Sequence, residues 1–165
     1  MNEKHMLEDI LLTYASDGNL AGITTTLEAN SDSTRALLNA RDANGDTPLM
    51  LAAWLGHTAV VQYLARQRQT PLNATNNNGA TAYLLAAAGG HEDIMTILAR
   101  TAGVNTKAKD KKGADANKLL DQYRKKTPRP APEISPEQKQ AIATLRVFNR
   151  APPFTGRSPA APALS

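Results

Sequence analysis

The 165-residue chain contains no cysteine, so it can form neither a disulfide framework nor a thiolate metal site. Aromatic residues make up only 4% of the chain, and Trp54 is the single tryptophan. No apolar run approaches the ~20 residues of a membrane-spanning helix. The first residues include Lys4, Glu8 and Asp9 and offer no apolar run typical of a signal peptide. We therefore expect neither classical secretion nor membrane insertion, and a cytoplasmic location.

Patterns that carry chemistry are also missing. Gly89-Gly90 is not part of a phosphate-binding loop, because no Gly-Lys-Ser or Gly-Lys-Thr follows it. None of the serines has a histidine placed as in a catalytic triad. The acidic pair Glu92-Asp93 lies in the first turn of an expected helix, where the backbone dipole favours negative charge. We expect no enzyme activity, no cofactor and no metal site.

What the chain does contain is a repeat with a period of 34 residues. Equivalent residues one period apart are Gly45, Gly79 and Gly113; Thr47 and Thr81; Gly56 and Gly90; and His57 and His91. Self-similarity at this period is typical of stacked helical units, whose function lies on a surface. Because the two histidines are equivalent, we expect each to bond backbone groups across a junction between units rather than to bind metal.

Within one period, each position has a local structural reason. Gly45 suits a tight turn, Thr47 can cap the helix that follows, and Pro48 fits the first helical position. Gly56 would end that helix, and the segment 60–64 gives a second helix an apolar stripe. The segments 42–64 and 76–98 share this scaffold, which resembles the ankyrin repeat.

The resemblance implies an all-α ankyrin-repeat solenoid over residues 5–126. We expect a degenerate first repeat at 7–41, full repeats at 42–75 and 76–109, and a degenerate cap at 110–126, with an insertion at 30–35. Where the family has His after Thr-Pro-Leu, this chain has Met50 and Leu84, so a hydrogen bond between neighbouring turns is lost. Each such bond contributes ~1 kcal/mol, which predicts a softer stack.

The composition changes after Lys126. Residues 127–165 hold eight of the ten prolines, which predicts a disordered, Pro-rich tail. Within it, Ser135-Pro136 favours the start of a helix at 135–149. A helix of this length has only marginal stability by itself in water. It therefore needs to pack against the stack or against another molecule.

Charge is divided unevenly along the chain. Residues 1–106 carry six basic and ten acidic side chains, a balance of −4, whereas residues 107–165 carry thirteen and five, a balance of +8. Such a basic region can bind nucleic acid or an anionic surface. The interpretation that we favour is a terminal repeat that keeps a polar outer face for solubility. We do not expect nucleic acid to be the main partner.

In ankyrin-like proteins, the hairpin tips and the first helices form a concave face that binds partners. The resemblance therefore implies a protein–protein interaction module, expected as a monomer. The candidate partner-binding residues are Asn44, Asp46, Trp54, Leu55, Asn77, Asn78, Ala88, Lys111 and Lys112. Trp54 is the candidate anchor, and the alternative is that it packs within its own chain. The Asn run at 76–78 has the alternative of simple turn chemistry.

Two mechanisms stay open at this stage. The concave face around Trp54 could grip a partner while the tail acts as a tether, or the tail helix could dock on the stack and regulate access. Ankyrin-like proteins of this size also include companions or inhibitors of a co-expressed enzyme, and bacterial effectors. The polar, basic C-terminal segment would suit delivery into a host cell by a non-classical route.

Overall fold

The computed structural model describes residues 3–127, which form helices and no strand. The helices are α1 (Glu3–Ser16), α2 (Leu20–Ala29), α3 (Thr34–Leu38), α4 (Pro48–Leu55), α5 (Thr58–Arg66), α6 (Ala82–Gly89), α7 (Glu92–Arg100) and α8 (Ala116–Lys126), with a 3-10 turn, η1 (Ser31–Ser33), before α3. The Pro-rich tail from residue 128 onward, including the helix predicted at 135–149, lies outside the described residues.

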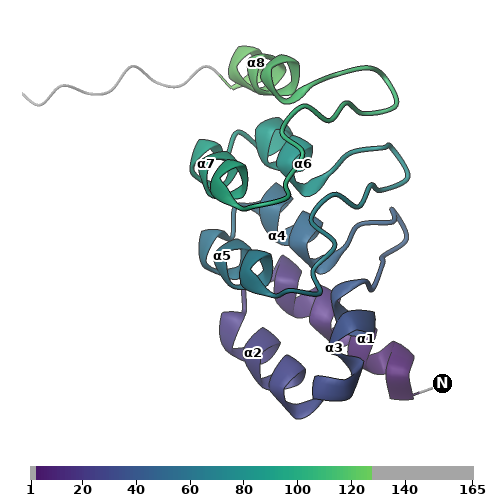
Figure 1. Ribbon diagram of the computed structural model, residues 1–165. Coiled ribbons are helices and arrows are strands. Elements are labelled where there is room, and N and C mark those ends of the chain that lie inside the picture. Colours follow the sequence, from purple (N-terminus) through teal and green to yellow (C-terminus); the bar gives the residue numbers. More distant parts are fainter. Residues whose placement is uncertain (1–2, 128–165) are drawn as a thin grey trace, which may run out of the picture. The chain divides into compact units, whose positions relative to one another are not determined.

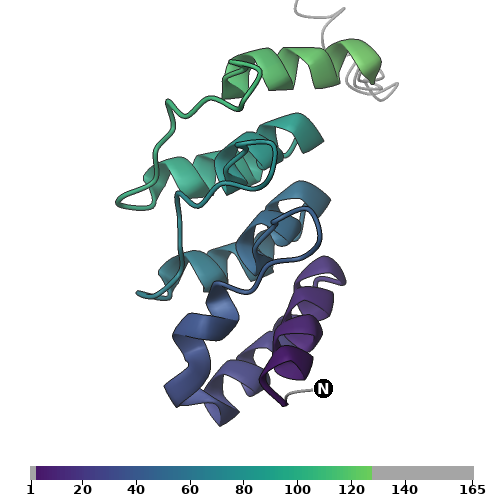
Figure 2. The same cartoon turned by 90° about the vertical axis from the view of Figure 1, so that its right-hand side faces the viewer.

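The helices of residues 3–127 stack in two columns. Helices α1, α4, α6 and α8 contact one another in succession, and α2, α5 and α7 form the second column (Figure 1). The view turned by 90° shows the tiers rising in chain order from α1 to α8 (Figure 2). The prediction of an all-α solenoid of stacked helix pairs is confirmed. The exact repeat and domain boundaries stay a prediction.

Small side chains let the first helices of neighbouring repeats approach closely. Ala52 and Ala53 of α4, and Ala86 and Ala87 of α6, are all fully buried. The second helix of each pair is amphipathic, with Val61 and Leu64 of α5 buried in the same core. A smaller cluster between α6 and α8 includes Leu84 and Leu120. Burial of these apolar side chains between repeats is the main force that holds the stack together.

Three hairpins connect the helix pairs and repeat one geometry. In each, the N–H of the first residue donates to the carbonyl oxygen four residues later, at 3.0–3.1 Å, in the pairs Asp42–Asp46, Asn76–Ala80 and Asp110–Ala114. Gly45 supplies the positive φ of 77° that the turn requires. Neighbouring tips are joined by backbone bonds of 3.0 Å, from Asn77 to Asn44 and from Lys111 to Asn78. The tips therefore form a continuous ladder along the stack.

The helix caps expected from sequence are present, and the last helix has one of its own. Thr47 Oγ1 and Thr81 Oγ1 each accept a bond from the backbone N–H three residues on. In α8 the carboxylate of Asp115 plays this part and accepts from Lys118 N at 3.0 Å. Aspartate is as good an N-cap as threonine, so the cap survives the change of residue.

Other side chains connect the turns where the family histidine is missing. Met50 is buried, and its Sδ accepts a bond from the N–H of Thr47 within its own turn. Between turns, Arg41 Nη1 donates to the carbonyl oxygen of Thr75 at 2.9 Å, and Asn77 Nδ2 donates to that of Ala43 at 3.1 Å. The junction between the two central repeats thus has hydrogen bonds of its own.

The first helix pair has local features of its own. Helix α1 begins at Glu3, four residues before the expected start of the repeat at residue 7. The insertion expected at 30–35 folds into the turn η1 and the start of the short helix α3. Leu37 and Leu38, which follow the insertion in α3, are buried in the core.

Candidate functional site

The inner face of the stack consists of the exposed sides of α4, α6 and α8 together with the hairpin tips beside them. Leu51, Leu85 and Leu119 occupy the same position in these three helices and are half-buried. Because the helices stack in register, the three leucines form an apolar row along this face. These leucines are not among the residues predicted to bind a partner, although their spacing of 34 residues was a usable signal in the sequence.

Trp54 and Leu55 lie at the C-terminal end of α4, with 46% and 45% of their surface exposed. Trp54 follows Leu51 by three residues, so both belong to one side of the helix. Gly56, in the left-handed conformation with φ 86°, ends α4 directly after Leu55. An exposed indole next to an exposed leucine is an apolar feature large enough to matter for binding.

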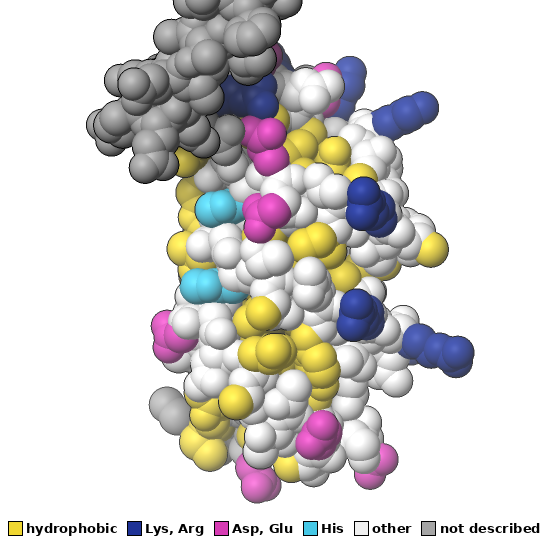
Figure 3. Space-filling view, turned by 90° about the vertical axis from the view of Figure 1, so that its left-hand side faces the viewer, with side chains coloured by type: hydrophobic (Ala, Val, Ile, Leu, Met, Phe, Trp, Pro, Cys, Tyr) yellow, Lys and Arg dark blue, Asp and Glu magenta, His cyan; other side chains and the backbone are white. Residues whose placement is uncertain are grey.

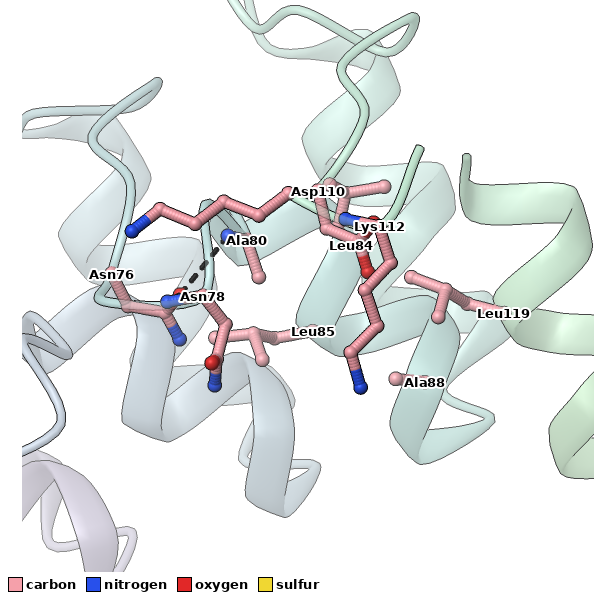
Figure 4. Close-up of a pocket in the computed structure, with 10 residues that line it drawn as sticks. Asn76, Asn78, Ala80, Leu84, Leu85, Ala88, Asp110, Lys112 and Leu119 are labelled. Carbon is pink, nitrogen blue, oxygen red and sulfur yellow. Dashed lines mark hydrogen bonds between the residues drawn. The ribbon is translucent and has the colours of Figure 1, made fainter. Parts of the chain in front are cut away.

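A pocket of about 220 Å³ opens between α6, α8 and the two adjoining hairpins (Figure 4). Its apolar lining is Ala80, Leu84, Leu85, Ala88 and Leu119, and its polar lining is Asn76, Asn78, Asp110, Lys111 and Lys112. Four of the residues expected to bind a partner, Asn78, Ala88, Lys111 and Lys112, are thus brought together in one cavity. Trp54, Leu55, Asn44, Asp46 and Asn77 do not line it.

The asparagines at the hairpin tips have different surroundings. Asn44, Asn77 and Asn78 are all exposed. The side chain of Asn77 is engaged in the stack, since its Nδ2 donates to the carbonyl oxygen of Ala43. Within residues 3–127, the side-chain amide of Asn78 makes no hydrogen bond, so it is available to an incoming molecule. A structural role in the hairpin therefore accounts for the side chain of Asn77 but not for that of Asn78.

Asp46 is half-buried and is held by the next hairpin. Its Oδ1 accepts a bond from Asn76 Nδ2 at 2.7 Å. Burial raises the pKa of the Asp46 carboxyl; the bond from Asn76 lowers it and the neighbouring charge of Asp42 raises it. This carboxylate joins two repeats, which limits its freedom to meet a partner.

Lys111 and Lys112 form the tip of the third hairpin, and both are exposed. Neither makes an ion pair with any residue of the described segment 3–127. Asp110 precedes the two lysines. Its Oδ1 accepts hydrogen bonds from the backbone N–H groups of Lys112 and Ala114, at 2.9 and 2.8 Å. The two ammonium groups thus give one end of the inner face a positive rim.

Both repeat histidines cross a junction between repeats, as expected from their equivalence. His57 Nε2 lies 2.7 Å from the carbonyl oxygen of Ser16, and His91 Nε2 lies 3.0 Å from that of Trp54. Since a carbonyl oxygen only accepts, each Nε2 is the donor. Figure 3 shows histidine side chains lying one above the other along the stack. In this position each imidazole joins its own repeat to the preceding one.

Exposed polar groups of α5, α7 and α8 also link neighbouring repeats. Thr58 Oγ1 donates to Asp93 Oδ2 at 2.6 Å, and Arg124 Nη2 lies 2.9 Å from Glu92 Oε1. The bond from Thr58 lowers the pKa of Asp93, against a smaller opposing effect of burial. Exposed pairs of this kind contribute little stability individually, at most about 1 kcal/mol each.

The comparison with family models gives a match to ankyrin repeats, in three copies, over residues 11–110. This span runs from within α1 to the start of the third hairpin and covers more than half of the chain. The chain belongs to the ankyrin repeat family. The comparison with curated proteins gives no match.

Ankyrin repeats are generally protein–protein interaction modules and generally non-catalytic. Three features of this ankyrin stack lie on its exposed inner face: the apolar row, the indole of Trp54 and the pocket. Across residues 3–127, no group of three or more His, Asp or Glu side chains is placed to hold a metal ion. None of the helices α1 to α8 is long and apolar enough to cross a membrane.

Proposed function

We propose that this protein binds another protein through the inner face of its ankyrin stack, as a monomer and without catalysis. The observation that carries the proposal is the nearly half-exposed indole of Trp54 beside Leu55, on α4, which packs against α6, one of the helices that line an open pocket. Burying such an aromatic anchor typically contributes ~2 kcal/mol or more to an interface. The candidate contacts are those expected from sequence together with the row Leu51, Leu85 and Leu119.

The backbone that carries Trp54 is also held in place before any partner arrives. Its carbonyl oxygen accepts the bond from His91, and the buried residues Ala52 and Ala53 fix the helix to its neighbours. A contact surface that needs no reordering loses less conformational entropy on binding, which favours affinity. The rigid stack therefore suits recognition of a partner by shape.

The test is capture of partners from the native cell by the wild-type chain and by Trp54→Ala. Trp54→Ala is expected to lose the specific partner. The matched control is Met6→Ala, which removes a similarly exposed apolar side chain from α1, with 55% of its surface exposed. Equal recovery by wild type and by Trp54→Ala would contradict the proposal.

A second candidate function is binding of nucleic acid or an anionic surface by the basic region. Its supporting observation is that all eight Lys and Arg side chains of 107–126 are exposed. The one aromatic residue of 107–126 is Tyr123, whose ring contacts Gly90, so the region offers a single ring for stacking on bases. Salt separates the two functions, because phosphate-driven affinity falls steeply with ionic strength while an apolar contact changes little.

The cellular setting is proposed as the cytoplasm, where this protein would act alone or as a companion or inhibitor of a co-expressed enzyme. The alternative is delivery into a host cell, supported by the basic composition of the C-terminal segment. A translocation assay would compare the full chain with a chain that ends at Lys126. Equal delivery of both would remove the segment from consideration.

A further inference from the structure

We propose that the pocket between α6 and α8 is a subsite for one apolar side chain within an acidic segment of the protein partner. This inference rests on the proposed protein-binding function and specifies the chemistry that the inner face would select. We call this cavity the α6–α8 pocket; its lining was given above. Three properties of the pocket support the proposal: its origin, its size and the charge of its rim.

One part of the pocket lining reflects a change of residue at one position of the repeat. Ala88 of α6 occupies the position that Trp54 occupies in α4, one period earlier. The small methyl group leaves space where an indole would stand, and Leu119 of α8 closes the far side (Figure 4). Leu84 and Leu85 complete an apolar floor. The inner face therefore presents a projecting apolar group in one repeat and an apolar recess in the next.

The size of the recess fits a side chain. Its volume is about 220 Å³. An apolar cavity of about 150 Å³ in another protein accepts benzene, whereas sites for drug-sized ligands begin at about 300 Å³. A leucine, methionine or phenylalanine side chain of a partner is therefore the fitting occupant, and a larger organic ligand is not.

The rim selects negative charge. Lys111 and Lys112 have no ionic partner within residues 3–127, and the free amide of Asn78 adds a hydrogen-bonding group beside them. The one acidic group of the lining, Asp110, has an oxygen that accepts bonds from two backbone N–H groups of its hairpin. The lining keeps a net charge of +1 from two lysines and one aspartate. An apolar side chain flanked by Glu or Asp matches both the floor and the rim.

The probe is a short synthetic peptide with a central Leu flanked by Glu and Asp, titrated into the isotope-labelled full chain and followed by NMR. We expect shifts at the amides of Leu85 and Ala88 and at the side-chain amide of Asn78. A peptide with Gln and Asn in place of the acids should bind about fivefold more weakly, and so should one with Ala in place of Leu. Absence of binding, or equal affinity of all three peptides, would overturn the proposal.

Variants then locate the binding on the pocket. Ala88→Leu fills the recess and is expected to weaken the acidic peptide at least tenfold, while Ala59→Leu, on an exposed position of α5, leaves its affinity unchanged. The double change Lys111→Glu and Lys112→Glu should reverse the preference between acidic and neutral peptides. The matched double change Lys125→Glu and Lys126→Glu alters the net charge by the same amount, but at the end of α8. It should not reverse the preference between acidic and neutral peptides. Equal effects of the two double changes would contradict a role for the rim.

The outcomes separate this inference from the proposed function. If Trp54→Ala abolishes capture of the native partner while the pocket variants leave peptide binding unchanged, the inner face binds protein and the subsite is wrong. If the peptide results hold and Trp54→Ala has no effect on capture, the subsite stands and the role of the indole is wrong. The exposed positions of Lys111 and Lys112 make a folding defect in their double variant a poor explanation of a loss.

Discussion

His91 Nε2 lies 3.0 Å from the carbonyl oxygen of Trp54. One side chain at the start of α7 therefore fixes the end of the helix that displays the exposed indole. His57 makes the corresponding contact with Ser16 one repeat earlier, at 2.7 Å. The histidines are thus structural residues that join neighbouring repeats.

Replacing His91 by Ala is expected to lower the free energy of unfolding by about 1–2 kcal/mol, because the carbonyl oxygen of Trp54 loses its donor. Urea denaturation of the full chain measures this difference. His5→Ala serves as the control, since His5 is exposed and pairs with Glu8 of its own helix rather than with another repeat. An effect of His91→Ala no larger than that of His5→Ala would show that the contact is not stabilising.

Gly56→Ala should destabilise the protein more than Gly103→Ala does, although both glycines have positive φ, 86° and 90°. A Cβ at Gly56 would lie 2.6 Å from Cε1 of His91, whereas one at Gly103 meets nothing within 4 Å. We expect about 1 kcal/mol of backbone strain at Gly103 and at least about 2 kcal/mol at Gly56. Thermal or urea unfolding distinguishes the two, and equal losses would mean that the ring moves away without cost.

Thr58→Val should lower the free energy of unfolding by about 0.5 kcal/mol at neutral pH and by less in acid. The bond from Thr58 lowers the pKa of Asp93 in the folded state, so its contribution is present above the unfolded pKa and is lost as pH falls through the folded pKa. Unfolding measured from pH 7 down to about pH 3 tests this. Thr25→Val, at an exposed position of α2 without a side-chain bond in the described segment, should show no such pH dependence.

Asp46→Asn should have the opposite pH dependence. Burial raises the pKa of Asp46 in the folded state, so its protonation stabilises the fold in acid, and this contribution is lost as pH rises through the folded pKa. An asparagine keeps an oxygen that can accept from Asn76 and carries no charge. As pH rises from about 3 to 7, the free energy of unfolding of Asp46→Asn should therefore increase relative to that of wild type. A constant difference across this range would contradict the role of burial.

The repeat made much of the fold predictable. Gly45, Thr47 and Pro48 each impose a local geometry, and their return after 34 residues leaves a stacked solenoid as the consistent solution. The family match confirms that prediction. The cap of α8 was harder to see, because Asp115 replaces the threonine and only its bond to Lys118 N reveals the equivalence.

The candidate face was predictable only in part. Trp54 and Lys112 were selected because they occupy positions that packing does not dictate, and both are exposed. Leu51, Leu85 and Leu119 were missed, since a leucine in an amphipathic helix is assigned to the core by default. Asp46 was selected as a surface residue, whereas its bond to Asn76 joins two repeats.

The sequence by itself determined the helices, the turns and the order in which they stack, because these depend on local backbone preferences repeated at a fixed period. Only the tertiary structure decided which equivalent positions become a projection and which a recess. Trp54 and Ala88 hold the same place in the pattern, but the space beside Ala88 forms a pocket only because Leu119 and the third hairpin close around it. Such closure is a property of neighbouring repeats, and no single repeat encodes it.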